Sequence, residues 1–314
     1  ENPLDFLNKQ FDASLIKDVQ TKWIPYDFKN QNIDDFLENL DIDKTVEISS
    51  IQGGYSNAIK QLNKFIEVGY QDYAKYRSDP SKEASSQLSP YFHSGQISTH
   101  EVFDKISELE SWSPESINPK MVGRREGWWG STENFESFMD ELITWRELGY
   151  HTCVRRANYN QYSSLPEWAI KTLHEHSSDE REHIYSLDEL TYSQTHDEIW
   201  NAAQNQLRTQ GVIQNYLRML WGKKILEWTP NPQIALSYMI TLNDRYSLDG
   251  RDPNSYSGVF WILGRYDRAW GPERSIFGKI RYMTSDSTAR KFNLKPYLEK
   301  WGNESLGVST SILK

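Results

Sequence analysis

Two tryptophans, Trp221 and Trp228, lie seven residues apart in the stretch YLRMLWGKKILEW (residues 216–228). In a helix this spacing equals two turns, so both rings share one face and lie about 10 Å apart along the axis. Such rings could relay an electron to a redox cofactor beyond one end of the helix. They could equally face a hydrophobic core, which is the commoner role of aromatic residues at helical spacing. This stretch by itself favours packing.

A carboxylate and an indole, Glu141 and Trp145, also lie four residues apart on a predicted helix. Residues at this spacing share a helix face. The pair could form an aromatic wall with a carboxylate that holds the amide or imide edge of a ligand. It could also be a helix edge at which the tryptophan packs and the acid is solvated.

The stretch LNDRYSLDGRDPNSYSG (residues 242–258) is dense in polar turn residues between apolar helical segments. A long polar loop inside a compact helical domain is often functional. It contains Asp249 and Arg251, and the amides of Asn243 and Asn254 could face a ring nitrogen.

Three hydroxyls, those of Ser85, Ser86 and Ser89, precede Pro90. Hydroxyls and free backbone N–H groups at a helix start bind phosphate well. An ordinary N-cap uses the same residue types, so both interpretations stay open.

Several common sites are excluded. His174, His176 and His183 suggest a metal, but residues two apart on a helix do not share a face, and no cysteine or carboxylate pattern completes a site. The sequence has no G-x-S-x-G elbow, no G-x-G-x-x-G motif and no P-loop lysine signature. We therefore expect neither a bound metal nor a serine hydrolase.

The composition sets further limits. The 314 residues include 12 Trp and 18 Tyr, which indicates an aromatic core, a stacked flat ligand or both. The net charge of −9 argues against a uniformly basic nucleic-acid binder. However, residues 1–50 have a net charge of −6 and residues 251–295 one of +5, so one face can still be basic.

The single cysteine, Cys153, excludes an intrachain disulfide and multi-thiolate sites, and it is typical of a reducing compartment. We found no apolar run of membrane-spanning length and no signal-peptide pattern. We therefore expect a cytoplasmic protein without membrane contact. The chain begins Glu1-Asn2-Pro3 without Met, so we expect its true N-terminus to be missing.

Helical periodicity dominates from about residue 51, and alternating strand patterns are nearly absent. Residues 1–50 are polar and acidic and are interpreted as a linker or the remnant of an N-terminal region. Residues 51–314 are predicted to form one all-α domain, with a surface insertion at about 111–131.

Five motifs occur in an order and register typical of one family: YAKYRSDP…SSQLSPYFHSGQIS, DELITWREL, THDEIWNAAQNQL, NYLRMLWGKKILEW and LNDRYSLDGRDPNSYSGVFW…DRAWG…GKIRYM. Together they closely resemble the FAD-binding helical domain of class II cyclobutane pyrimidine dimer photolyases, in the photolyase/cryptochrome superfamily. The resemblance covers about residues 50–295. Family members also have an N-terminal α/β domain, often with an antenna chromophore, and we expect this domain to be missing from the present sequence.

The resemblance implies a U-shaped FAD held by helices and active when fully reduced. The residues implied to bind it are Tyr73, Ser85, Ser86, Leu88, Ser89, Arg146, Asn215, Arg218, Asn243, Asp249 and Asn254. Arg218 paired with Asp249 would lie by the isoalloxazine ring. Asn243, or failing that Asn254, would face flavin N5.

The family's reaction is light-driven splitting of a flipped-out pyrimidine dimer in UV-damaged DNA by an electron from the reduced flavin. On this resemblance Glu141 would hydrogen-bond the dimer, Trp145 and Trp261 would form apolar walls, and Met219 would touch the dimer from the flavin side. The implied electron relay is Trp221 next to the flavin, Trp200 behind it and Trp228 at the surface. The residues implied to bind DNA phosphates are Arg77, Arg268, Lys279 and Arg281.

Three positions depart from the family pattern, namely Ser78, Ser94 and Gln214, and the last stands where a histidine is common. Two other functions stay open beside dimer repair. One is a cryptochrome-like photoreceptor without repair activity, and the other is repair of (6-4) photoproducts, for which no catalytic histidine is evident. We expect the protein to act as a monomer.

Overall fold

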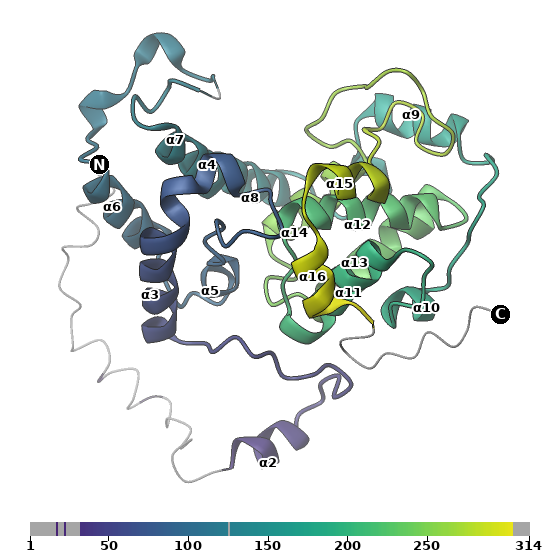
Figure 1. Ribbon diagram of the computed structural model, residues 1–314, viewed down its shortest axis with the longest axis horizontal. Helices are drawn as coiled ribbons and strands as arrows, with labels where there is room; N and C mark the ends of the chain where they lie inside the picture. Colours follow the sequence, from purple (N-terminus) through teal and green to yellow (C-terminus); the bar gives the residue numbers. More distant parts are fainter. Residues whose placement is uncertain (1–16, 18–21, 23–31, 125, 304–314) are drawn as a thin grey trace.

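The computed structural model describes residues 17, 22, 32–124 and 126–303, and it is built from helices (Figure 1). Within these ranges the β structure is limited to one isolated bridge between Arg274 and Gly278. The prediction of an all-α fold is confirmed. None of the described helices is long and apolar enough to cross a membrane. The helices form two groups, each around its own hydrophobic core.

The first group consists of α3 (Tyr55–Lys64), α4 (Tyr73–Tyr76), α5 (Ser89–His93), α6 (Thr99–Leu109) and α7 (Glu133–Met139). A π-helical turn, η2 (Phe65–Gly69), and a 3-10 turn, η3 (Tyr70–Asp72), join α3 to α4. The core between them is aromatic: the Phe65 ring lies 5.6 Å from that of Tyr73 and 5.2 Å from that of Phe138, centroid to centroid. Aromatic packing of this kind fixes the position of α4.

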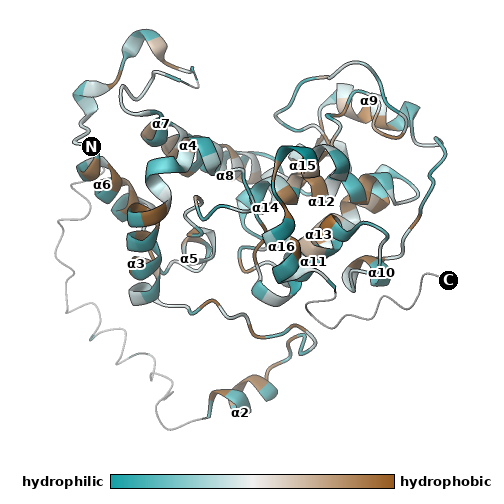
Figure 2. Cartoon of the chain, in the orientation of Figure 1, coloured by the Kyte–Doolittle hydropathy of each residue, from teal (hydrophilic) through white to brown (hydrophobic). Residues whose placement is uncertain are grey.

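The second group consists of α9 (Glu167–Glu175), α10 (Leu187–Thr191), α11 (Glu198–Gln210), α12 (Asn215–Glu227), α13 (Pro232–Tyr246), α14 (Pro253–Ile262), α15 (Ser285–Lys291) and α16 (Lys295–Trp301). Local signals begin and end these helices. Asp197 and Asn231 cap α11 and α13, and α11 ends at Gly211, whose φ of 76° is left-handed. Figure 2 shows hydrophobic residues along α11, α12 and α13, whose buried faces form this core.

The two groups meet where α8 (Arg146–Arg155) packs against α14. Helix α8 continues from α7 through a π-helical turn, η6 (Asp140–Trp145), and π-turns often occur at functional sites. Gly149 allows α8 and α14 to approach each other closely. A Cβ at this position would lie 2.9 Å from both Asn254 Oδ1 and Ser257 Oγ, which is too close. A 3-10 turn, η7 (Tyr162–Ser164), then leads to α9.

Polar contacts also cross between the groups. Gln214 caps α12 by accepting from two backbone N–H groups, and its Nε2 donates to the carbonyl of Arg77 at 2.9 Å. His93 Nδ1 lies 3.3 Å from Asp252 Oδ2, while Asp252 Oδ1 accepts from the N–H of Asn254 and caps α14. These side chains hold α4 and α5 against the starts of α12 and α14.

Residues 111–131 form an irregular loop with two 3-10 turns, η4 (Pro114–Ser116) and η5 (Pro119–Met121). Glu136 of α7 is 7% exposed and accepts hydrogen bonds from the N–H groups of Gly127 and Gly130. The indole of Trp112 donates to the carbonyl of Trp129 at 2.7 Å. The loop is therefore fastened to the first core.

Residues 32–50 include α2 (Ile33–Glu38) and contact the second group. Arg245 of α13 pairs with Asp43 at 2.7 Å, and Ser49 Oγ donates to the carbonyl of Gln210 at 2.7 Å. The rest of the predicted N-terminal region, apart from residues 17 and 22, lies outside the described residues. The proposed boundary at residue 50 stays a prediction.

Replacing Gly149 with Ala should separate α8 from α14 and lower the free energy of unfolding by about 1–3 kcal/mol, the usual cost of overpacking. Gly258→Ala in α14 is the matched control, because a Cβ there meets nothing within 4 Å. It should be neutral or slightly stabilising, since alanine favours helix. Urea denaturation of both variants measures the difference, and equal effects would contradict the close-contact argument.

Candidate active site between the two helix groups

Arg218, Asn243 and Asp249 form a polar group between α12, α13 and the loop before α14. Arg218 Nη1 donates to Asn243 Oδ1 at 2.9 Å, and Arg218 Nη2 lies 3.6 Å from Asp249 Oδ1. Both charged side chains are largely buried, at 17% and 16% exposed. The structure thus brings together Arg218 and Asp249, which the resemblance predicted to pair. It also places Asn243, the preferred candidate for facing flavin N5, against Arg218.

Asp249 stays ionised despite its burial. Burial alone would raise the pKa of its carboxyl, but the Arg218 guanidinium and the hydroxyls of Ser247 and Ser89 outweigh it and hold the pKa below the ordinary value. Ser89 begins α5, so this interaction also joins the first helix group to the polar loop. The Asp249 carboxylate is therefore the polar centre of the junction.

The two candidate asparagines have different surroundings. Asn243 is 3% exposed, and its Nδ2 donates to Asp244 Oδ1 at 3.1 Å. Asn254 instead donates from its backbone N–H and from Nδ2 to Asp252 Oδ1, as part of the α14 cap. Only Asn243 contacts Arg218, so the geometry favours it for a role beside that pair.

Glu141 accepts a hydrogen bond from Arg77 Nη1, and the two form an ion pair. The Arg77 guanidinium carbon also lies 5.8 Å from the centroid of the Tyr73 ring. Arg77 was expected to face DNA phosphates. In the structure its side chain is 20% exposed and turned inward to Glu141, so neither group is free.

Trp145 and Trp261 contact one another, with centroids 4.5 Å apart and planes 32° apart. They make one continuous aromatic surface rather than two facing walls. The expected pairing of Glu141 with Trp145 on one α-helical face is altered by η6, because residues five apart are neighbours in a π-helix. The indole of Trp145 accordingly donates to Asp140 Oδ2 at 2.9 Å.

The remaining residues predicted to bind the cofactor are more scattered. Ser85 and Ser86 are partly exposed before α5, whereas Leu88 is 0% exposed, so its side chain belongs to the first core. Arg146 Nη2 donates to the hydroxyl of Tyr150 at 3.1 Å. Three further residues have different surroundings: Tyr73 is buried, Asn215 is exposed at the start of α12, and Met219 packs partly on the second core.

The three relay tryptophans lie close together. The Trp200 indole donates to the carbonyl of Trp221 at 3.0 Å, and the Trp200 and Trp228 ring centroids are 5.6 Å apart. The indole of Trp221 donates to Gln204 Oε1 at 2.8 Å. The expectation that Trp228 lies at the surface is wrong. It is 2% exposed because the Tyr185 and His196 rings pack against it at 5.4 and 5.2 Å.

The predicted basic face contains an aromatic centre that sequence reasoning missed. Arg268 and Arg281 lie 4.5 and 4.9 Å from the centroid of the Trp270 ring. Lys279, also predicted to bind DNA, pairs with Glu273 at 3.1 Å. In the sequence, the only sign of this centre was that Trp270 lies between Arg268 and Arg281.

Chemically, the loop before α14 and its neighbours offer a buried guanidinium–carboxylate pair with an amide, and the contact of η6 with α14 offers a carboxylate and two indoles in contact. The first set suits the polar edge of a flat heterocycle, and the second suits a flat ligand with N–H donors. Behind them runs a line of redox-active indoles. Among the described residues, no group of three or more His, Cys, Asp or Glu side chains is placed to hold a metal ion.

Comparison with known proteins decides the family. The chain is 40% identical over 267 residues to a protein named deoxyribodipyrimidine photo-lyase from Methanothermobacter thermautotrophicus, and 38% identical over 263 residues to one of the same name from Potorous tridactylus. These alignments cover 85% and 83% of this chain. The chain belongs to the photolyase/cryptochrome superfamily. Its fold also matches an archaeal photolyase from Sulfolobus tokodaii with a TM-score of 0.54 over 90% of this chain, at 17% identity.

Within the photolyase/cryptochrome superfamily the chain matches only part of its relatives. It covers 55% and 46% of the two named relatives and 53% of the Sulfolobus protein, or about half of each. No protein-family model matches the sequence. The helical fold of the superfamily is therefore shown, and the activity of the whole relatives is not thereby shown for this chain.

Asp249→Asn tests the polar centre of the junction. A carboxyl whose pKa is lowered by folding stabilises the fold above its ordinary pKa, and this contribution is lost as the pH falls through the lowered value. We expect the variant to lose about 1–3 kcal/mol of unfolding free energy at pH 7, as for a broken buried hydrogen-bonded charge. This loss should shrink as the pH approaches 3.

Chemical denaturation across this pH range measures the effect, with the exposed Asp72→Asn as the control. A loss for Asp249→Asn that stays constant with pH would show that the charge of Asp249 contributes nothing.

Proposed function

We propose that this chain is the FAD-binding helical domain of a class II cyclobutane pyrimidine dimer photolyase and that it repairs UV-damaged DNA in light. The observation that carries the proposal is the position of Glu141 and the stacked Trp145–Trp261 pair at the same junction as Arg218, Asn243 and Asp249. A carboxylate, an aromatic surface and a polar ring-edge site are what this reaction requires. Relatives of the chain named deoxyribodipyrimidine photo-lyase support it.

The junction fits FAD. When bound there, FAD in its reduced, light-excited form supplies the electron that splits the dimer. Arg218 and Asn243 would meet the polar edge of its ring system, and the hydroxyls before α5 would meet its phosphates. Arg146 supports the assignment, because within the described ranges its guanidinium contacts Tyr150 and Phe92 but no carboxylate. A cation without a protein anion suits a diphosphate.

The dimer would lie on the Trp145–Trp261 surface with its N–H edge toward Glu141. Bases in a duplex cannot reach such a position, so the lesion must be flipped out, which costs least for a damaged pair. Binding also has to displace Arg77 from Glu141. Arg268 and Arg281 around Trp270 would then contact the phosphates of the flanking strand. Each residue thus positions the lesion or neutralises charge.

The line of Trp221, Trp200 and Trp228 would keep the bound cofactor reduced by passing electrons inward. Burial of all three rings supports this role, because a dry, close-packed path has short edge-to-edge gaps. A photoreceptor without repair activity would use the same path. Glu141 and the paired indoles favour the photolyase over the photoreceptor, since a sensor has no need of a dimer pocket.

Glu141→Gln should lower light-dependent repair of a dimer-containing oligonucleotide about tenfold to a hundredfold, because a charged hydrogen bond is worth about 1.5–3 kcal/mol. Flavin content should not change. Repair is measured as recovery of thymine absorbance under near-ultraviolet light, with a dark control. Glu147→Gln, at an exposed position of α8, should repair normally. Wild-type protein that binds flavin but restores no thymine would overturn the proposal in favour of the photoreceptor.

Trp200→Phe should abolish most light-driven flavin reduction while leaving repair by chemically reduced protein intact, because phenylalanine packs but is not oxidised. Its lost contacts should cost about 1–2 kcal/mol of stability. Trp112→Phe, in the aromatic cluster under the 111–131 loop, is the matched control. It should lose similar stability but photoreduce normally. Equal photoreduction in both variants would exclude Trp200 from the relay.

A further inference from the structure

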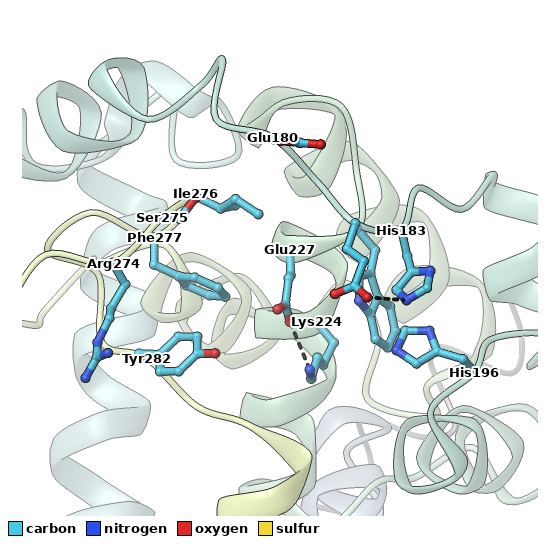
Figure 3. Close-up of a pocket in the computed structure, with 12 residues that line it drawn as sticks. Glu180, His183, His196, Lys224, Glu227, Arg274, Ser275, Ile276, Phe277 and Tyr282 are labelled. Carbon is cyan, nitrogen blue, oxygen red and sulfur yellow. Dashed lines mark ion pairs between the residues drawn. The ribbon is translucent and has the colours of Figure 1, made fainter.

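A pocket of about 470 Å³ lined in part by Trp228 opens at the C-terminal end of α12 (Figure 3). Lys224 and Glu227 of α12 lie on one side of the pocket, and Phe277 and Tyr282 lie on the other. Trp228, which follows α12, also lines it. His183 and His196 close one end. Apart from Trp228, none of the residues that line this pocket is among the site residues predicted from the sequence, and none belongs to the proposed lesion site.

The pocket gives a solute access to a buried ring. Trp228 is 2% exposed, yet it lines the pocket, and Trp200 behind it is 0% exposed. A molecule in the pocket therefore touches the outer end of the tryptophan line without entering the core. Because Trp228 is not a surface residue, an electron donor that reacts by contact has to occupy this space.

One histidine beside Trp228, His196, can take up a proton, and His183 lies next to it. The His196 ring lies 5.2 Å from that of Trp228 and 4.0 Å from that of His183, centroid to centroid. His196 Nδ1 lies 2.7 Å from the hydroxyl of Tyr185, which orients the ring. Burial and the neighbouring His183 lower the pKa of His196, so this imidazole is neutral near pH 7. A neutral imidazole is a proton acceptor.

The charges of the pocket favour a ligand without net charge. Lys224 is 2.9 Å from Glu227 and 3.9 Å from Asp197, so its charge is already balanced. The lining also contains both signs of charge, with Arg274 beside the Tyr282 ring and the acidic residues Glu180 and Glu182 elsewhere in the pocket. An anion or a cation would meet like charge on one wall, whereas a flat, neutral, hydroxylated ring can stack on Tyr282 and Phe277 and hydrogen-bond the charged groups.

We propose that this pocket binds a small neutral phenol of the hydroquinone class, which returns an electron to Trp228 after Trp228 has been oxidised. One electron passes from the phenol to the indole cation radical, and the phenolic proton passes to the His183–His196 pair. The products are neutral Trp228, a neutral phenoxyl radical and a protonated imidazole. The inference rests on the proposed relay, which is what oxidises Trp228.

The first test is binding and saturation. Calorimetric titration of the flavin-containing protein with hydroquinone in the dark should show one site. The initial rate of light-driven flavin reduction should then saturate with hydroquinone concentration. Tyr282→Ala should raise the half-saturating concentration about fivefold, the worth of one aromatic contact. Tyr282 is 43% exposed, and Tyr192→Ala, at a position 48% exposed outside the pocket, is the matched control and should leave it unchanged.

The second test is proton transfer. His196→Gln should lower the plateau rate and remove its solvent deuterium isotope effect, whereas the exposed His174→Gln should do neither. A rate that rises linearly with hydroquinone in the wild type, or an unchanged half-saturation in Tyr282→Ala, would overturn the proposal. If anionic ascorbate gives the same saturation of the photoreduction rate and the same response to the two pocket variants, the proposal of a neutral ligand is overturned.

The two proposals fail in different assays. Repair by dithionite-reduced protein does not require the pocket. If this repair is absent, the photolyase function is refuted, and the hydroquinone titration still tests the pocket. Normal repair by reduced protein combined with unsaturable photoreduction refutes the pocket alone.

Discussion

The close packing of α8 on α14 at Gly149 is the contact on which the candidate site depends. It places the π-helical turn, which carries Glu141 and Trp145, beside the helix that carries Trp261 and next to the loop that carries Asp249. Each helix group has its own core, so neither core alone determines where these side chains meet. Because Gly149 has no Cβ, α8 and α14 pack closely enough to bring the two halves of the candidate site together. The polar contacts of Gln214 and Asp252 fix the orientation of the two helix groups.

The buried tryptophans of the second core pack in a way that also suits the proposed electron relay. Trp200 and Trp221 are among the largest fully buried side chains of the second core, and their indole N–H groups are bonded to a carbonyl and to Gln204. Saturated hydrogen bonds and dense packing keep both rings rigid. Rigidity and the exclusion of water also suit electron transfer, so packing and relay are not alternatives. The same packing would hold the proposed relay in a fixed geometry.

Much of the fold and part of the site follow from local sequence. Helical periodicity and the near absence of strand patterns predicted the all-α architecture, and the family resemblance predicted that Arg218 and Asp249 would pair. What could not be predicted depends on residues far apart in the chain. Trp228 is buried because Tyr185 and His196 fold over it, and Arg77 meets Glu141 across 64 residues. The π-turn was also missed, because its extra residue per turn leaves no compositional signal, and it turns Trp145 toward Asp140.

The ion pair between Arg77 and Glu141 has a consequence for selectivity. The carboxylate already has a cationic donor, so an incoming ligand competes with an internal one instead of entering a vacant site. A ligand edge with N–H donors can replace the bonds that Arg77 gives up, whereas an edge with only acceptors leaves a carboxylate unsatisfied and repelled. In the proposed lesion site Arg77 would therefore compete with the ligand for Glu141, and the site would discriminate by hydrogen-bond donors as well as by shape.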